Sequence, residues 1–172
     1  MGSVILNHQP APDFSLPDLG GDLHVLSGLR GKVVIINFWS CECPHAARSD
    51  ELLLAYLKEW GEQVALLTLA ANANEPINHL KEVANQRGLP LVLHDAGHRV
   101  ANLYGALTTP HLFVIDKEGI LRYQGAFDDV TFRQRTPTCF YLQGAVDAVL
   151  RGGIPDPDQT PSYGCIIVRF AP

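Results

Sequence analysis

The sequence predicts a single α/β domain built around a mixed β-sheet, and three observations support that prediction. Two apolar runs rich in β-branched residues, 33–39 and 64–70, have the pattern of buried strands. Segments with helical spacing of apolar residues follow both runs, which favours parallel pairing. A later pair of strand-like runs is joined by a short turn that ends in Gly119, which predicts antiparallel pairing.

The first half of the chain contains an extended arm, a buried strand and a long helix. Prolines punctuate residues 11–17, which predicts an arm or a short hairpin before the strand at 33–39. A helix starts at Pro44, because proline is tolerated at the first helical position. Gly61 ends this helix, so Cys43 lies at or beside its N-cap.

The second half continues the alternation and then changes to a hairpin. The expected elements are a strand at 64–70, a helix from 75–76 to about Gly88, a short strand at 91–93, a brief helix at 98–104, strands at 111–116 and 120–124, and a last helix at 140–150. Prolines after Ile154 exclude regular structure directly beyond that helix. We therefore expect a domain over residues 1–153, including the N-terminal arm, and a C-terminal tail over residues 154–172.

Composition excludes several classes of partner. The 172 residues carry a net charge of −5, and their basic residues are scattered, so we expect no nucleic-acid partner. No apolar run approaches the roughly 20 residues of a membrane helix, so we expect a soluble, cytoplasmic chain with no membrane partner. Four cysteines are too few for a disulfide scaffold, and two of them lie two residues apart, which points to chemistry.

Several separate phrases resemble the thioredoxin superfamily over nearly the whole chain. They are the strand that ends at Trp39, the cysteine at a helix start, and the Thr109-Pro110 pair before a hairpin. The phrases 11–14 and 29–39 are similar to those of the alkyl hydroperoxide reductase and thiol-specific antioxidant branch, the redoxins. This resemblance implies a thioredoxin-like three-layer α/β/α fold with a central mixed sheet. It also implies a cis bond before Pro110, facing Cys43 within about 10 Å.

The active-site phrase departs from both better-known patterns of this superfamily. Ala46 stands where a thioredoxin-like reductase carries its second cysteine, so a CxxC dithiol is absent. Ser40, Cys43 and Pro44 satisfy the short peroxiredoxin pattern, but Ile36 replaces the proline expected upstream. Cys41 is an additional thiol that neither pattern predicts.

Cys43 is the predicted nucleophile. An ordinary cysteine, with a pKa near about 8.5, is mostly protonated at neutral pH, whereas a helix N-terminus stabilises the thiolate. His45 would add to this effect if protonated, and the resemblance places aromatic residues such as Trp39 beside the thiol. The alternative is that Cys43 is a buried, inert cysteine.

The thiol that resolves the oxidised nucleophile is open at this stage. Cys41 is the nearest candidate along the chain, through a strained two-apart disulfide, and its alternative is a small residue at a strand end. Cys165 is the rival, because its tail could fold back to the helix start, and otherwise it is an ordinary tail cysteine. From proximity, we predict that Cys41→Ser slows recycling more than Cys165→Ser does. Cys139 is expected to fill space in the core or at the surface.

The leading functional hypothesis is a thiol-disulfide oxidoreductase or a peroxiredoxin-like peroxidase with antioxidant activity, serving cell redox homeostasis. Its substrate would be a protein or small-molecule disulfide, or a peroxide, with an external thiol reductant and no cofactor. Five histidines are scattered without zinc-site spacing, so no metal is expected, although His111 follows the Thr-Pro pair; they are His24, His79, His94, His98 and His111. Two alternatives are a copper-binding or copper-assembly protein of this fold, using Cys41, Cys43 and a histidine, and a non-enzymatic binding module.

Overall fold

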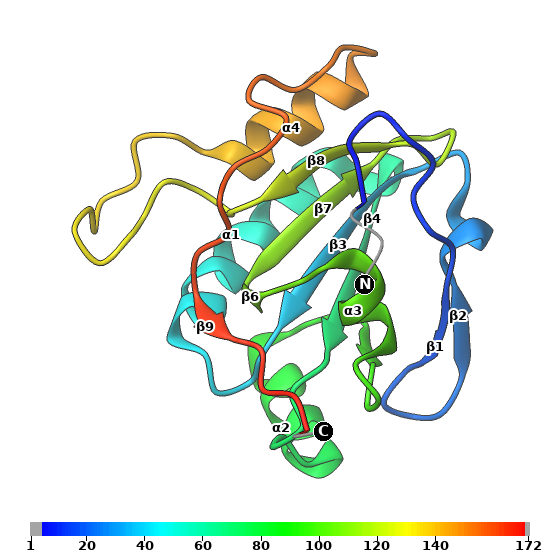
Figure 1. The fold of residues 1–172 in the computed structure, drawn as a ribbon, viewed down its shortest axis with the longest axis vertical. Coiled ribbons are helices and arrows are strands. Elements are labelled where there is room, and N and C mark those ends of the chain that lie inside the picture. Colours follow the sequence, from blue (N-terminus) through cyan, green and yellow to red (C-terminus); the bar gives the residue numbers. More distant parts are fainter. Residues whose placement is uncertain (1–4, 171–172) are drawn as a thin grey trace.

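A mixed sheet of five strands forms the centre of the computed structural model, which describes residues 5–170 (Figure 1). Its strands are β3 (Val33–Trp39), β4 (Val64–Ala70), β5 (Val92–His94), β7 (His111–Ile115) and β8 (Leu121–Gly125), in the order β5-β4-β3-β7-β8. The first three are parallel, while β7 pairs antiparallel with both β3 and β8. The predicted α/β class and mixed sheet are therefore confirmed.

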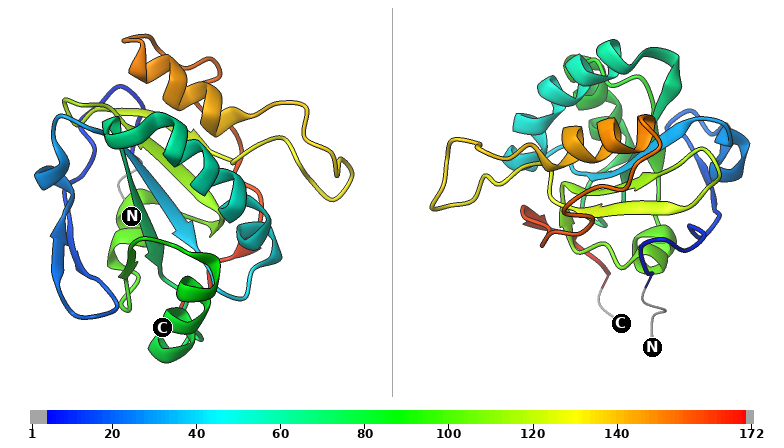
Figure 2. Two further views of the ribbon diagram at one scale, coloured as in Figure 1. Left: turned by 180° about the vertical axis from the view of Figure 1, so that it is seen from behind. Right: turned by 90° about the horizontal axis from the view of Figure 1, so that it is seen from above.

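Helices cover both faces of this sheet, as the views in Figure 2 show. The helices are α1 (Pro44–Trp60), α2 (Ile77–Arg87), α3 (Arg99–Tyr104) and α4 (Tyr141–Leu150), with 3-10 turns η1 (Leu26–Leu29) and η2 (Gly61–Gln63). Apolar residues of α1 and α4 pack on one face, against β3 and β7. Residues of α3 and of the N-terminal segment pack on the other face. None of the helices within residues 5–170 is long and apolar enough to pass through a bilayer.

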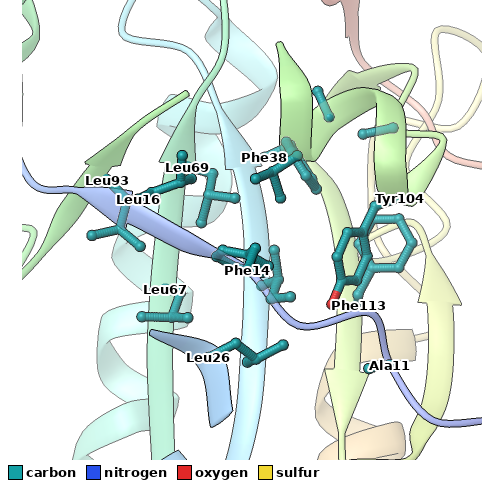
Figure 3. Packing of buried hydrophobic residues seen from close by; sticks show 14 of the residues in the cluster. Ala11, Phe14, Leu16, Leu26, Phe38, Leu67, Leu69, Leu93, Tyr104 and Phe113 are labelled. Atoms are coloured by element: carbon teal, nitrogen blue, oxygen red, sulfur yellow. The ribbon is translucent and has the colours of Figure 1, made fainter. Parts of the chain in front are cut away.

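The N-terminal arm is part of the core. It forms the expected hairpin, β1 (Ser15–Pro17) with β2 (Leu23–Val25), and inserts Phe14 beneath the sheet (Figure 3). The Phe14 ring meets Tyr104 of α3 edge-on with 5.8 Å between centroids, and Tyr104 in turn packs on Phe113 at 5.2 Å. Such aromatic pairs stabilise a core beyond simple area burial. The arm therefore fixes α3 against the sheet.

The segment after α4 returns across the molecule and docks on it. Its short strand β9 (Cys165–Ile166) pairs antiparallel with β6 (Thr108–Thr109), so that Cys165 lies opposite Thr109 (Figure 1). Ile167 is buried in the core, and Val168 exchanges hydrogen bonds with the 72–73 loop at 2.8 Å. A Cβ added at Gly164 would collide with the Thr109 carbonyl, so glycine permits this approach. Although its prolines prevent a helix, this segment has a fixed position.

Candidate active site

Cys43 occupies the junction that the sequence predicts. It is the N-cap residue of α1, with Pro44 at the first helical position, and only 2% of its surface is exposed. The buried strand β3 delivers the chain to this point, and the Cys43 N–H bonds back to the Ser40 carbonyl at 3.4 Å. A buried strand followed by a proline-started helix therefore fixes the position of the thiol.

Two neighbours contact the Cys43 sulfur. Its Sγ lies 3.0 Å from the carbonyl oxygen of Thr109 and 2.9 Å from the Sγ of Cys165. The Thr109-Pro110 bond is cis, which confirms the isomer that we expected before Pro110 and the proximity of this loop to the thiol. Because Cys165 lies opposite Thr109 in the β6–β9 pair, the same pairing delivers the second sulfur.

The surroundings of Cys43 favour its thiolate. Burial alone would raise the pKa of this thiol, but hydrogen bonds to its sulfur, among them those from the Cys165 side chain and from the backbone N–H of Ala46, outweigh burial and lower the pKa below its ordinary value. The first N–H groups of the 17-residue helix α1 add the positive end of its dipole. These contacts therefore favour the ionised form of Cys43.

Cys165 has the opposite tendency. Burial and the neighbouring Cys43 sulfur raise the pKa of the Cys165 thiol to about 12. Cys165 accordingly keeps its proton when Cys43 loses one, and its S–H can donate to the Cys43 thiolate. Both are free thiols in this structure. A disulfide would require the two sulfurs to approach by about 0.9 Å, to the usual length near 2.05 Å.

Cys41, the other predicted partner, lies in an acidic environment. It is 4% exposed and belongs to the apolar cluster that also contains Trp39 and Leu80. Burial raises the pKa of the Cys41 thiol to about 12, and the nearby carboxylates of Glu75 and Glu42 add to the rise. This thiol resists ionisation even though it is two residues from Cys43.

The remaining predicted environment residues make contacts of their own. The Ser40 hydroxyl donates a short hydrogen bond to the buried carboxylate of Glu75. Trp39 is fully buried, and its indole N–H donates to Asp50 at 3.0 Å. The His45 ring meets Tyr163 of the docked segment edge-on, with 5.2 Å between centroids. His45 thus helps to hold the segment that carries Cys165.

A family comparison decides the classification of this chain. The model of the AhpC/TSA family matches residues 8–124, more than half of the sequence. The chain belongs to the AhpC/TSA family. The match includes Cys43 and the Thr109-Pro110 loop, whereas Cys165 lies beyond its end.

Relatives of this AhpC/TSA-family chain are named as thiol-disulfide exchange proteins. The thiol-disulfide oxidoreductase ResA of Geobacillus thermodenitrificans is 39% identical over 115 residues, 63% of each chain. The thiol:disulfide interchange protein DsbE of Allochromatium vinosum is 28% identical over 67% of this chain and 64% of its own. The chain thus spans less than two thirds of the length of these relatives.

A solved structure matches almost the full length of this AhpC/TSA-family chain. It is a hypothetical protein of Sinorhizobium meliloti 1021, with a TM-score of 0.88 at 32% identity, and the match covers 99% of this chain and 98% of that one. The thioredoxin domain of a thiol-disulfide oxidoreductase from Bacteroides vulgatus also matches, with a TM-score of 0.62 at 17% identity over 76% of this chain and 93% of that one, so the thioredoxin-like fold is established. The likeness to the Sinorhizobium protein extends across the docked segment.

His111 lies next to the cis proline of this AhpC/TSA-family site, but its contacts are those of a packed side chain. Its Nδ1 accepts the Leu107 N–H at 3.2 Å, and its ring stacks on Phe113 with 4.7 Å between centroids. Burial lowers the pKa of His111 to about 4, so the ring is neutral near pH 7. Of the two roles open to His111, site or packing, the contacts favour packing.

Sequence reasoning missed two features of this AhpC/TSA-family site. Glu75, at the predicted helix start, is 5% exposed and lies beside Cys41, a position that sequence reasoning did not assign to the site. His98, expected on a surface or turn, is buried, and its Nδ1 bonds to the Ala71 carbonyl at 2.6 Å. No periodicity marks a buried polar residue in a loop, but an acidic residue after a buried strand was an available signal for Glu75.

Proposed function

We propose that this chain is a thiol-disulfide oxidoreductase in which Cys43 is the nucleophile and Cys165 the resolving thiol. The observation that supports the proposal is the 2.9 Å separation of their sulfurs, combined with opposite shifts of the two pKa values. A nucleophile must be a thiolate, and a resolving thiol must stay protonated until the first exchange has occurred. The pair has that division of roles.

The reaction with a disulfide substrate has two exchange steps. The Cys43 thiolate attacks one sulfur of the substrate disulfide, forming a mixed disulfide and releasing the other sulfur as a thiolate. Cys165 then gives its proton to that thiolate and attacks the Cys43 sulfur. The second substrate sulfur leaves as a thiolate and takes a proton from water, so the products are a Cys43–Cys165 disulfide and two substrate thiols, with the substrate reduced and the protein oxidised. An external dithiol or thiol pair returns the protein to its reduced state.

Disulfide exchange is favoured over peroxide reduction by two observations. The ResA and DsbE relatives are named for disulfide exchange. The hydroxyl of Ser40, which fits the peroxiredoxin pattern by spacing, bonds to Glu75 and not to a group at the Cys43 sulfur. With a peroxide, Cys43 would become a sulfenic acid and Cys165 would release water from it. The two reactions therefore share both thiols and differ in the first oxidant.

The choice of Cys165 reverses the order expected from sequence proximity. Cys41 is nearer along the chain, but the sulfur within contact of Cys43 belongs to Cys165, 122 residues away. Because β9 is already paired with β6 in the folded chain, disulfide formation needs no further loss of entropy to close the loop between Cys43 and Cys165. We therefore expect Cys165→Ser, and not Cys41→Ser, to stall the cycle.

The test is single-turnover oxidation followed by mass mapping. The reduced chain is mixed anaerobically with a small peptide disulfide or, in a parallel arm, with hydrogen peroxide. We expect the wild type to form a Cys43–Cys165 disulfide and Cys43→Ser to form none. Cys165→Ser should accumulate the mixed disulfide, while Cys41→Ser and the control Cys139→Ser react like the wild type. A Cys41–Cys43 disulfide, or normal recycling in Cys165→Ser, would overturn the assignment. Preference for the peroxide would favour the peroxidase.

A further inference from the structure

A second group of reactive side chains lies behind the redox pair and takes no part in it. A sulfur of Cys41, a carboxylate oxygen of Glu42 and an imidazole nitrogen of His79 all lie within 4.8 Å of one another. Cys41 and Glu42 come from the turn between β3 and α1, and His79 from the first turn of α2. The rigid ends of two elements thus bring together three atoms of types that bind metal ions.

The spacing of these atoms suits a small four-coordinate ion. In a tetrahedral zinc site, bond lengths of about 2.0 to 2.3 Å place sulfur, nitrogen and oxygen ligands about 3.3 to 3.6 Å apart. Here Glu42 Oε1 and His79 Nε2 are 2.5 Å apart as an ion pair, and the sulfur is within 4.8 Å of both. Coordination therefore requires Glu42 Oε1 and His79 Nε2 to separate by about 1 Å, a shift that changes of side-chain torsion can provide.

The electrostatic environment of the group favours a cation. Glu75 is 5% exposed and lies beside Cys41, and its Oε2 has no hydrogen-bond partner although it is buried. Its other oxygen is already bound by Ser40 and by the Asn72 amide at 3.2 Å. The buried carboxylate of Glu75 is costly without a positive charge beside it, because buried charges need partners, whereas Glu42 is exposed and already paired with His79. A divalent ion bound to the sulfur would supply that charge.

We propose that Cys41, Glu42 and His79 form a Zn²⁺ site whose fourth position is open to solvent. Mixed sulfur, nitrogen and oxygen donors suit zinc, whereas magnesium and calcium prefer oxygen ligands alone and Cu(I) prefers soft ones. Glu42 and His79 are partly exposed on the outer side, so water can complete the coordination. Binding displaces the Cys41 thiol proton to solvent and transfers no electrons.

This site is independent of the proposed redox function. It uses no atom of Cys43 or Cys165, so either proposal can fail alone. It also differs from the copper alternative, which requires Cys41 and Cys43 to share one ion.

The experiment measures metal binding to the full-length chain, reduced and metal-free, under anaerobic conditions. Zn²⁺ is titrated in competition with a chromophoric chelator, and Co²⁺ is added separately to report a thiolate ligand through its charge-transfer absorption. We expect one ion per chain and a thiolate–cobalt band. Cys41→Ser should remove the band, and His79→Gln should weaken zinc binding by about tenfold or more. His79 is half-exposed, so this variant keeps the fold even if a change at buried Cys41 does not.

Matched controls separate this site from the other thiols and histidines. His24 also pairs with a carboxylate, at 2.9 Å from Asp18, but its pair lies outside the cysteine-containing cluster, so His24→Gln should bind zinc like the wild type. Cys139→Ser should do the same. The proposal is overturned if the wild type binds no zinc. It is equally overturned if binding survives in His79→Gln and Cys41→Ser but is lost in Cys43→Ser or Cys165→Ser, since the ion would then sit on the redox pair.

Discussion

Cys43 and Cys41 are two residues apart and almost equally buried, yet their surroundings shift their pKa values in opposite directions. The pKa of Cys43 is lowered, because hydrogen-bond donors and a helix N-terminus face its sulfur. Burial raises the pKa of Cys41 to about 12, with the carboxylates of Glu75 and Glu42 adding to the rise. The comparison teaches that the groups facing a sulfur, more than its depth or its place in a motif, decide whether it is a nucleophile.

The largest expected effect comes from separating the docked segment from Cys43. In Gly164→Ala, the added methyl collides with the Thr109 carbonyl, so β9 cannot pair with β6. We expect formation of the Cys43–Cys165 disulfide to slow by about 100-fold, because a misplacement of about 1 Å can have that effect. The Cys43 pKa should also rise, since a donor to its thiolate is lost, which narrows its difference from Cys41.

Quenched-flow oxidation with mass mapping measures that rate. Gly144→Ala in α4 is the matched control, because a Cβ there meets open space. An unchanged rate in Gly164→Ala would show that β9 pairing does not hold the two sulfurs together.

The next effect concerns the pH dependence of folding stability that His111 causes. It must be known before changes with pH are assigned to the two thiols. Its folded-state pKa of about 4 is below the ordinary value of about 6.5, so the unfolded chain binds more protons between these values. The contribution of neutral, buried His111 to the free energy of unfolding is therefore fully present above about pH 6.5 and is lost as the pH falls toward 4. Between about pH 7 and pH 5 the loss is about 2 kcal/mol.

Urea unfolding of the reduced chain at both pH values checks this prediction. His111→Gln should lose about 2 kcal/mol less than the wild type over the same interval. His24→Gln, a change at a partly exposed histidine, serves as the control. Equal pH dependence in the wild type and in His111→Gln would assign the acid sensitivity to another group.

The smallest effect tests whether the Glu75 carboxylate contributes to the raised pKa of Cys41. Glu75→Gln removes a buried charge beside Cys41, so the Cys41 pKa should fall by about one unit while Cys43 titrates as before. At a pH well below both pKa values, alkylation of Cys41 should become up to about tenfold faster, because the thiolate fraction rises tenfold for a one-unit fall in pKa. Mass-mapped alkylation across a pH series measures each cysteine separately, and Glu62→Gln at an exposed position is the control. A joint shift of both thiols would mean that the two environments are coupled.

Local patterns predict the fold and the place of Cys43 at the start of α1, because β3, α1 and the hairpin are specified by neighbouring residues. Pro44 is enough to predict where α1 begins, and the family resemblance is enough to predict the cis bond between Thr109 and Pro110. The position of Cys165 could not be predicted, because it depends on β9 pairing with β6, which lies about a third of the chain earlier in the sequence. Likewise, Cys41 and His79 come together only through the packing of α2 at the end of β3, which no spacing rule encodes.

The position of β9 near the end of the chain also determines when, during synthesis, both sulfurs of the proposed pair are present. Cys43 and Cys165 are separated by 122 positions, so the ribosome completes the first thiol and its strand long before the second. At synthesis rates of about 5 to 20 residues per second, the nascent chain carries an unpaired reactive cysteine for roughly 6 to 24 seconds. During that interval the sulfur of Cys165 is absent from its place 2.9 Å from Cys43, so under the proposed mechanism a nascent chain could form mixed disulfides but could not resolve them.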